Sequence, residues 1–328
     1  MSDKKKVLIT GGAGFIGSHV NLLLRERGYD TTILDNLSRG NPNSIVGGEL
    51  IRGEIGDREL LDRLFSQESF DAVMHFAAFT DVGESTAQPE LYYENNVVES
   101  LTLIEAVQRH RIPAFIFSSS AAVYGNPDKD VVQESDLLSP INPYGRSKLM
   151  VEQILDDFST YHGMKSTSLR YFNAAGGDPE GRIRHRKPKE NNLIPIVLLA
   201  ALESKPVTIF GTDYPTPDGT CLRDYIHVLD LAEAHLLAME RLLHGGDSTH
   251  YNLGNGNGYS VRQVIQATEE VTGQKIQVLE GDRRAGDPAI LLSNAKKASQ
   301  ELNWKPQYPA LSDIVAHAWN AYRPAPKN

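Results

Sequence analysis

The stretch "VLITGGAGFIGSH", residues 7–19, decides the fold. Its first part, Val7–Thr10, is a short apolar run typical of a buried strand. Three glycines follow at a spacing of three, at Gly11, Gly14 and Gly17. Because glycine has no Cβ atom, the backbone can turn tightly there and approach a pyrophosphate, whose charge then lies at the N-terminus of the next helix. The stretch therefore predicts a strand, a dinucleotide-binding loop and a helix.

A carboxylate at the end of the second predicted strand supports a dinucleotide site. Residues 31–35 read as that strand, and Asp35 ends it. An acid there accepts hydrogen bonds from both ribose hydroxyls of an adenosine and repels a 2′-phosphate, which favours NAD over NADP. Arg39 is the competing signal, because an arginine near this position can bind a 2′-phosphate.

Short apolar strands and helical patterns alternate through the first half of the chain. Further strands are predicted at 49–55, 72–76, 114–117 and 166–172, and helices at 58–66, 89–110 and 144–161. Such alternation indicates a parallel sheet that is covered on both faces and joined by right-handed crossovers. We therefore expect an α/β fold, specifically a Rossmann-type doubly wound parallel sheet.

The alternation ends after Phe172, and residues 174–192 are rich in glycine, proline and charge, which is typical of a loop. We expect residues 1–173 to form an NAD-binding Rossmann domain, to which part of 221–250 returns. Residues 174–328 should then form most of a smaller, discontinuous, C-terminal substrate-binding α/β domain over the carboxyl edge of the sheet, where ligands of such sheets bind.

Composition argues against several other classes of protein. The formal net charge of −9 disfavours a general binder of nucleic acid or of an anionic membrane. The one cysteine, Cys221, allows no internal disulfide and fits a reducing compartment. Neither a signal peptide nor an apolar run of transmembrane length is visible, so we expect a cytoplasmic protein. The histidines lack zinc-ligand spacing, and we expect no metal; His75, inside a predicted strand, reads as a structural residue.

The segment "NPYGRSK", residues 142–148, places Tyr144 four residues before Lys148, on one face of a helix that Pro143 can begin. A nearby ammonium favours the phenolate and lowers the pKa of the tyrosine. Such a tyrosine can take a proton from a hydroxyl while hydride leaves the same carbon. By itself the pair reads more often as an exposed helix face than as a site; after a dinucleotide loop it predicts chemistry.

Serines follow the fifth predicted strand in "SSSAAVYG", residues 118–125. Ser118 and Ser120 would lie at the carboxyl end of that strand, beside the bound dinucleotide. A serine hydroxyl there can hold the reacting oxygen of a substrate. Without the strand before it, the segment would read as a serine-rich turn.

Taken together, the motifs resemble the extended branch of the short-chain dehydrogenase/reductase superfamily and, within it, the UDP-glucose 4-epimerase (UDP-galactose 4-epimerase) family. The resemblance covers almost the whole chain. It rests on "VLITGGAGFIGSH", "LDNLSRG", "YYENNV", "FIFSSSAAVYG", "PYGRSKLMVEQIL", "LRYFNAAG", "NNLIP", "YNLGNG", "RRAGDPA" and, most specifically, "DYPTPDGTCLRDYIHV".

The resemblance implies reversible 4-epimerisation of UDP-galactose and UDP-glucose. Tightly bound NAD would be used, with transient oxidation at C4, a 4-keto intermediate and hydride return to the opposite face. Tyr144 would be the acid/base, Lys148 would tune it and bind the nicotinamide ribose, and Ser120 would bind the sugar O4. It also implies a homodimer in which the helices at 89–110 and 144–161 pair.

The same resemblance implies two sets of binding residues. For the cofactor these are Gly11, Gly14, Phe15, Ile16, Gly17, Asp35, Asn36, Glu54, Ile55, Phe76, Ala77, Ala78, Asn95, Ser118, Tyr144, Lys148 and Tyr171. For the UDP-sugar they are Ser120, Tyr144, Phe172, Asn173, Asn192, Leu193, Phe210, Arg223, Tyr225, Arg284, Asp287 and Leu291. Without the resemblance, the two arginines read as surface ion-pair residues.

Three positions depart from the family pattern. Thr80 stands where many relatives have a lysine that contacts the cofactor, and Glu54 stands where an aspartate usually meets the adenine. Leu291 occupies a position that gates substituents at C2 of the sugar: tyrosine restricts the site to the plain hexose, and smaller residues admit an N-acetyl group. Leucine leaves open an epimerase that prefers UDP-N-acetylhexosamines or another UDP-sugar.

Other readings compete. Dehydratases on this scaffold need an acid beside the active-site serine, and Ala121 and Ala122 stand there instead. A reductase that consumes NADPH is disfavoured by Asp35. A non-catalytic relative that binds NAD or a sugar nucleotide is disfavoured by the presence of Ser120, Tyr144 and Lys148 together. The basic run "RIRHRKPK", residues 182–189, reads as a solvated loop rather than a nucleic-acid patch in an acidic chain.

Overall fold

A computed structural model describes residues 4–184, 190–284 and 288–323. Its centre is a seven-stranded sheet in the order β11-β7-β5-β4-β1-β2-β3, and every neighbouring pair is parallel. The strands are β1 (Lys6–Thr10), β2 (Asp30–Asp35), β3 (Glu49–Arg52), β4 (Ala72–His75), β5 (Ala114–Ser120), β7 (Ser166–Tyr171) and β11 (Thr249–Leu253). The strand order reverses beside β1, which opens the crevice where such sheets bind ligands.

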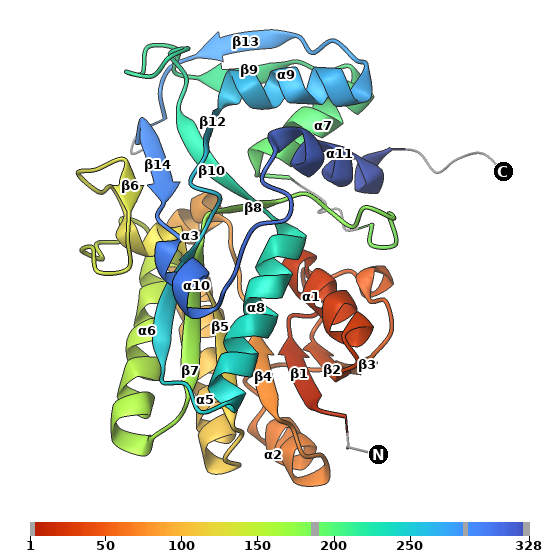
Figure 1. Cartoon of the computed structure of the whole chain (residues 1–328), viewed down its shortest axis with the longest axis vertical. Helices are drawn as coiled ribbons and strands as arrows, with labels where there is room; N and C mark the ends of the chain where they lie inside the picture. Colours follow the sequence, from red (N-terminus) through yellow and green to blue (C-terminus); the bar gives the residue numbers. More distant parts are fainter. Residues whose placement is uncertain (1–3, 185–189, 285–287, 324–328) are drawn as a thin grey trace, which may run out of the picture.

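Helices cover both faces of this sheet (Figure 1). On one face, α1 (Phe15–Glu26) and α8 (Val228–Leu243) pack over a core that includes Val7 and Ile9. On the other face, α2 (Arg58–Gln67), α5 (Glu99–Arg109) and α6 (Pro143–His162) pack over a core that includes Leu8. Neighbouring residues of β1 thus point into opposite cores, as expected for a strand that is buried on both faces. The predicted Rossmann-type doubly wound sheet is confirmed.

The helix expected at 89–110 is divided. It consists of α4 (Pro89–Tyr93), a π-helical turn η2 (Glu94–Val98) and α5. Such a turn inserts a residue into the helix and changes the direction of nearby side chains, and it is frequently found at functional sites. Here it places Asn96 so that its amide brackets the backbone of Phe79, accepting from the N–H at 2.9 Å and donating to the C=O at 3.0 Å. Periodicity alone could not separate this turn from the α-helix around it.

A second region lies beyond the carboxyl ends of the strands (Figure 1). It holds a five-stranded sheet made of β12 (Gly258–Ser260), β10 (Leu222–His227), β14 (Ile290–Ser293), β6 (Val131–Val132) and β8 (Asn173–Ala175). A two-stranded sheet pairs β9 (Val207–Phe210) with β13 (Val278–Gly281). Helices α7 (Leu193–Glu203), α9 (Val261–Thr272) and α11 (Leu311–Tyr322) share a separate core.

The chain crosses between the two regions more than once. After β10 it returns to the large sheet as α8 and β11, and α10 (Lys296–Glu301) packs beside β11. In the other direction, β6, which belongs to the first half of the chain, pairs with β14 in the second region. The remaining short elements are η1 (Pro42–Ser44), α3 (Val82–Ala87) and η3 (Ala121–Tyr124). The domain limits given above stay a prediction.

Candidate active site

A cavity of about 460 Å³ lies between the large sheet and the second region. Its walls come from the loop between β1 and α1, from the ends of β2, β4 and β5, from the start of α6, and from the second region. The volume is within the usual range for a small-molecule site. Residues more than 200 positions apart in the chain, such as Gly11 and Leu291, therefore line one space.

The glycine loop is shaped as a cradle that side chains would fill. Gly11 has a φ of +71°, and a Cβ atom there would lie 2.5 Å from the backbone nitrogen of Ala77. At Gly17 a Cβ atom would lie 2.5 Å from the carbonyl oxygen of Gly11. The open backbone at the N-terminus of α1 suits a pyrophosphate, so the residues present fit a dinucleotide.

Asp35 lines the cavity at the end of β2, and the backbone holds its carboxylate. One oxygen accepts from the N–H of Ala13 at 2.9 Å, and the other accepts from the N–H of Leu37 at 2.8 Å. Burial raises the pKa of Asp35, and these two hydrogen bonds oppose that rise. Each oxygen keeps a lone pair, which suits a ribose diol.

Arg39, the competing signal for a 2′-phosphate, lines the same cavity, but its guanidinium is already paired. Its guanidinium pairs with Glu84 at 2.7 Å and lies 5.0 Å from the ring centroid of Phe79. The geometry therefore favours NAD. Glu54 and Thr80, which depart from the family pattern, both line the cavity, and Glu54 accepts a hydrogen bond from the amide of Asn36 at 2.7 Å.

The start of α6 determines the positions of Tyr144 and Lys148. The side chain of Asn142 caps the helix by accepting from the N–H of Gly145 at 2.8 Å, and Pro143 occupies the first turn. Tyr144 lines the cavity together with Ser120. Lys148 lies behind that wall, 2% exposed, and its Nζ donates to the carbonyl oxygen of Ser118 at 2.8 Å.

The electrostatics of this pair differ from the sequence expectation. Burial raises the pKa of Tyr144, and only the side chain of Ser120 opposes the rise. Burial also lowers the pKa of Lys148 to about 7. The expectation that the ammonium lowers the pKa of the tyrosine is therefore not met here, because desolvation disfavours the charged form of both groups.

Comparison with known proteins assigns the chain to a family. Residues 7–254 match the family described as NAD dependent epimerase/dehydratase. This chain belongs to that family.

Its relatives within the NAD dependent epimerase/dehydratase family match along nearly the whole chain. A UDP-glucose 4-epimerase from Halalkalibacterium halodurans is 48% identical over 98% of this chain and 96% of its own length. The structure of a UDP-glucose 4-epimerase from Brucella ovis in complex with NAD superposes with a TM-score of 0.94, at 41% identity over 96% of this chain and 97% of that one. The UDP-Glc/GlcNAc 4-epimerase of Campylobacter jejuni gives a TM-score of 0.86, at 41% identity over 97% and 100%.

Most residues that the sequence pointed to line the cavity. They are Gly11, Gly14, Phe15, Ile16, Gly17, Asp35, Asn36, Glu54, Ile55, Phe76, Ala77, Ala78, Asn95, Ser118, Ser120, Tyr144, Tyr171, Phe172, Asn173, Asn192, Arg223 and Leu291. Five lie elsewhere: Lys148 behind the wall, Leu193 at the start of α7, Tyr225 in the core of the second region, and Phe210 with Arg284 stacked 4.0 Å over its ring. Asp287 lies outside the described residues.

Sequence reasoning missed several residues of the cavity wall. Gly40 packs against Asp35, and a Cβ atom there would lie 2.9 Å from its carboxylate, so the last glycine of "LDNLSRG" was an available signal. Asn191, Phe79, Val82 and Glu99 gave no comparable signal, because only the tertiary fold brings them to the cavity.

His75 is structural, with Nδ1 2.7 Å from the hydroxyl of Thr10 and Nε2 2.9 Å from that of Ser100. Burial lowers its pKa to about 3, so it stays neutral. Across the described ranges, no group of three or more His, Cys, Asp or Glu side chains could hold a metal ion. Within those same ranges, none of the helices has the length and apolarity needed to cross a membrane.

Proposed function

We propose that this chain interconverts UDP-galactose and UDP-glucose by inverting C4 of the sugar. One observation carries the proposal: Ser120 and Tyr144 line the same cavity as the dinucleotide cradle of Gly11. Relatives that match along nearly the whole chain are UDP-glucose 4-epimerases, which supports the assignment.

The residues present fit NAD. The glycine loop would hold its pyrophosphate, Asp35 and Asn36 the adenosine ribose, and Lys148 the nicotinamide ribose. Bound NAD supplies the acceptor and donor of hydride at C4 of the sugar.

Tyr144 would move the proton. Its phenolate takes the proton of the O4 hydroxyl as C4 is oxidised, and the resulting phenol gives that proton back to O4 as the 4-keto sugar is reduced on its other face. Ser120 would hold O4 during both steps. Because Tyr144 is buried and its pKa is raised, it needs a nearby positive charge to act as a base, and protonated Lys148, one helical turn away, is placed to supply it.

The UDP-sugar would occupy the side of the cavity that the second region forms. Asn173, Asn192 and Arg223 line that side and present amide and guanidinium donors. Phosphate oxygens are good partners for such donors, above all for arginine. Phe210 and Arg284, which stack on each other outside the cavity wall, would contact a nucleotide that extends beyond it.

A second candidate substrate class is the UDP-N-acetylhexosamines. Leu291, whose side chain is smaller than tyrosine, lines the cavity, and the similar Campylobacter jejuni protein is named a UDP-Glc/GlcNAc 4-epimerase. Assay of UDP-N-acetylgalactosamine with the wild type and with Leu291→Tyr tests this. If the wild type converts UDP-N-acetylgalactosamine and Leu291→Tyr converts only UDP-galactose, Leu291 controls access of the N-acetyl group. If the wild type does not convert UDP-N-acetylgalactosamine, this second substrate class is rejected.

We also propose that the protein is a cytoplasmic homodimer. The single cysteine favours a reducing compartment. Exposed apolar residues on the two candidate interface segments, Val98 on η2 and Met150 on α6, support pairing of two copies. Sedimentation velocity should give about twice the monomer mass, and Val98→Glu/Met150→Glu should halve it.

The test of the function uses purified protein with UDP-galactose and no added NAD, beside Tyr144→Phe. We expect UDP-glucose to form with the wild type and the rate to fall by about 100-fold or more with the variant. No turnover by folded protein that carries NAD would reject this function and favour a non-catalytic relative that binds NAD or a sugar nucleotide.

A further inference from the structure

Four side chains that bear ionisable groups follow one face of α6. Tyr144, Lys148, Glu152 and Asp156 are spaced four residues apart, so each lies one turn beyond the last. The first two belong to the site described above. Glu152 is buried, at 1% exposed, whereas the side chain of Asp156 is 55% exposed.

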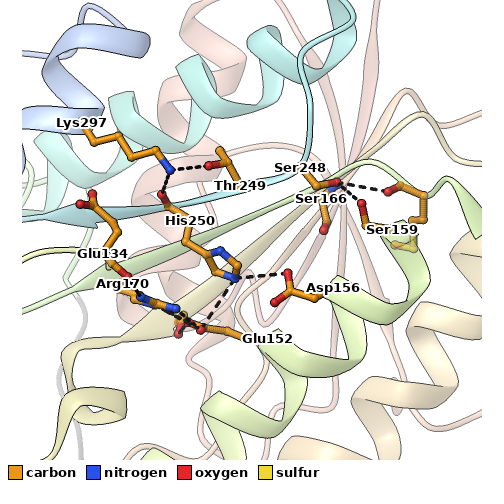
Figure 2. Close-up of polar contacts among 12 residues, drawn as sticks. Glu134, Glu152, Asp156, Ser159, Ser166, Arg170, Ser248, Thr249, His250 and Lys297 are labelled. Carbon is orange, nitrogen blue, oxygen red and sulfur yellow. Dashed lines mark hydrogen bonds and ion pairs between the residues drawn. The ribbon is translucent and has the colours of Figure 1, made fainter. Parts of the chain in front are cut away.

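Glu152 is held by a buried guanidinium. Arg170 of β7 donates to it from Nη2 at 2.7 Å and from Nε at 3.0 Å and 3.1 Å, and both side chains are almost fully buried. Figure 2 shows this pair beside His250 of β11, whose Nε2 lies 3.9 Å from Glu152 and 3.4 Å from Asp156. A buried pair of this kind is costly to desolvate, so its presence calls for a reason other than stability.

Glu152 also reaches the strand that carries the active-site serines. The hydroxyl of Ser119 donates to its carboxylate. The residues on either side of Ser119 belong to the site: the carbonyl of Ser118 accepts from Lys148, and Ser120 lines the cavity together with Tyr144. In the sheet register Ser119 lies opposite Arg170, so the pair closes a link between β5, β7 and α6.

We propose that Glu152 is a positioning residue for the epimerase reaction: its carboxylate, fixed by Arg170, clamps the end of β5 to α6 and keeps Lys148 in its charged form. This rests on the proposed function, in which a charged Lys148 supports Tyr144. The carboxylate of Glu152, behind the cavity wall, would thus both stabilise the charge of Lys148 and fix the end of β5 relative to α6.

The surroundings of Lys148 support the charge argument. Burial lowers its pKa to about 7, and the carboxylate of Glu152 acts in the opposite direction. The titratable and charged groups around the Lys148–Glu152 pair are His75 on β4, Tyr124 on η3, Glu134 in the segment after β6, Tyr144 and Asp156 on α6, Arg170 on β7 and His250 on β11.

The test follows the titration of Lys148 itself in the protein as purified with its nucleotide. The ¹³Cε resonance of Lys148, labelled with [¹³Cε]lysine and assigned by its loss in Lys148→Met, gives the midpoint. Glu152→Gln keeps the acceptor for Ser119 and removes the charge, so we expect the midpoint to fall by about one pH unit. Arg170→Gln leaves the carboxylate unneutralised, so we expect the midpoint to rise. Asp156→Asn, two turns from Lys148, is the matched control and should leave it unchanged.

Opposite shifts in the two variants support the proposal, because a merely structural pair would give the same disturbance from either side. Shifts in the same direction, or none, overturn it. If Glu152→Gln does not fold with Arg170 unpaired, the double variant Glu152→Gln/Arg170→Gln replaces it, and its midpoint should still lie below that of the wild type. An unchanged midpoint in the double variant also overturns the proposal.

The titration does not depend on turnover, so its result is separate from that of the UDP-galactose assay. Where the wild type is active, the alkaline limb of its kcat profile should move to lower pH in Glu152→Gln, while Asp156→Asn keeps the wild-type profile. An unmoved limb in a folded, active Glu152→Gln variant overturns the inference and leaves the epimerase function standing.

Discussion

The Nζ of Lys148 lies 2.8 Å from the carbonyl oxygen of Ser118, so the helix that begins with Tyr144 is tied to the strand that ends with Ser120. This hydrogen bond joins α6 to β5 behind the cavity wall. It fixes the hydroxyls of Tyr144 and Ser120 relative to each other, and it holds the ammonium beside the ring of Phe117, at 4.9 Å from its centroid.

Replacing this lysine should separate catalysis from folding. Lys148→Met removes the charge and the bond to Ser118, and we expect kcat to fall by about 100-fold or more. Lys148→Arg keeps a cation but brings a planar group that does not fit a point-charge site, so it should rescue little. Steady-state assay of UDP-galactose conversion checks this. A folded Lys148→Met variant with wild-type kcat would remove the lysine from the mechanism.

The glycine cradle should tolerate no Cβ atom at Gly11. In Gly11→Ala the new methyl group would meet the backbone of Ala77, so we expect protein that purifies with little or no nucleotide. Gly28→Ala is the matched control: its φ of +86° is also strained for alanine, but nothing lies within 4 Å of the added atom. It should lose about 1 kcal/mol of stability and keep its nucleotide. Equal nucleotide content in both variants would contradict the cradle.

Asp35 should set the preference for the cofactor. In Asp35→Asn one oxygen becomes an amide that cannot accept from the N–H of Ala13 or Leu37, and the repulsion of a 2′-phosphate is lost. We expect the Kd for NADH to rise roughly tenfold or more, and the ratio of the Kd values for NADPH and NADH to shrink. Fluorescence titration of nucleotide-free protein measures both, and an unchanged ratio would exclude this role.

Acid should destabilise the fold in part through His235, which lies on α8 between the rings of Phe76 and Tyr171. Burial lowers its pKa to about 4, although a hydrogen bond to the carbonyl of Leu231 opposes this. The unfolded chain takes up this proton below about pH 6.5, so the stability is fully present above that value and is lost as the pH falls toward 4.

The comparison with His235→Leu isolates that contribution. Between pH 7.5 and pH 4.5 the wild type should lose about 2 kcal/mol more of its unfolding free energy than the variant does. Urea unfolding at the two pH values measures this. Equal losses in both proteins would mean that His235 is not held neutral.

The sequence predicted local features well and long-range ones poorly. The strand, turn and helix around Gly11 follow from residues that are neighbours in the chain, and the structure agrees closely. The pairing of β6 with β14, by contrast, joins residues about 160 positions apart through backbone hydrogen bonds that neither segment signals. Short strands with no repeat of their own, such as Val131–Val132, depend on the partner that the fold brings to them.

The site shows the same limit. The spacing of Tyr144 and Lys148 predicted that they share a face, but it could not predict how deeply Lys148 is buried, and burial reverses the expected effect on the pKa of the tyrosine. Glu152 gave no signal of its own, because its partner Arg170 lies on another element. Desolvation and partner choice are properties of the packed structure.

The most direct measurement of the central claim, oxidation and reduction at C4, is conversion of UDP-[4-²H]galactose in ordinary water. Hydrogen that leaves C4 as hydride and returns as hydride never meets solvent, so we predict that the UDP-glucose formed keeps its deuterium at C4. Mass spectrometry and NMR of the product decide the matter. Product that carries ordinary hydrogen from the solvent at C4, in place of deuterium, would contradict the mechanism.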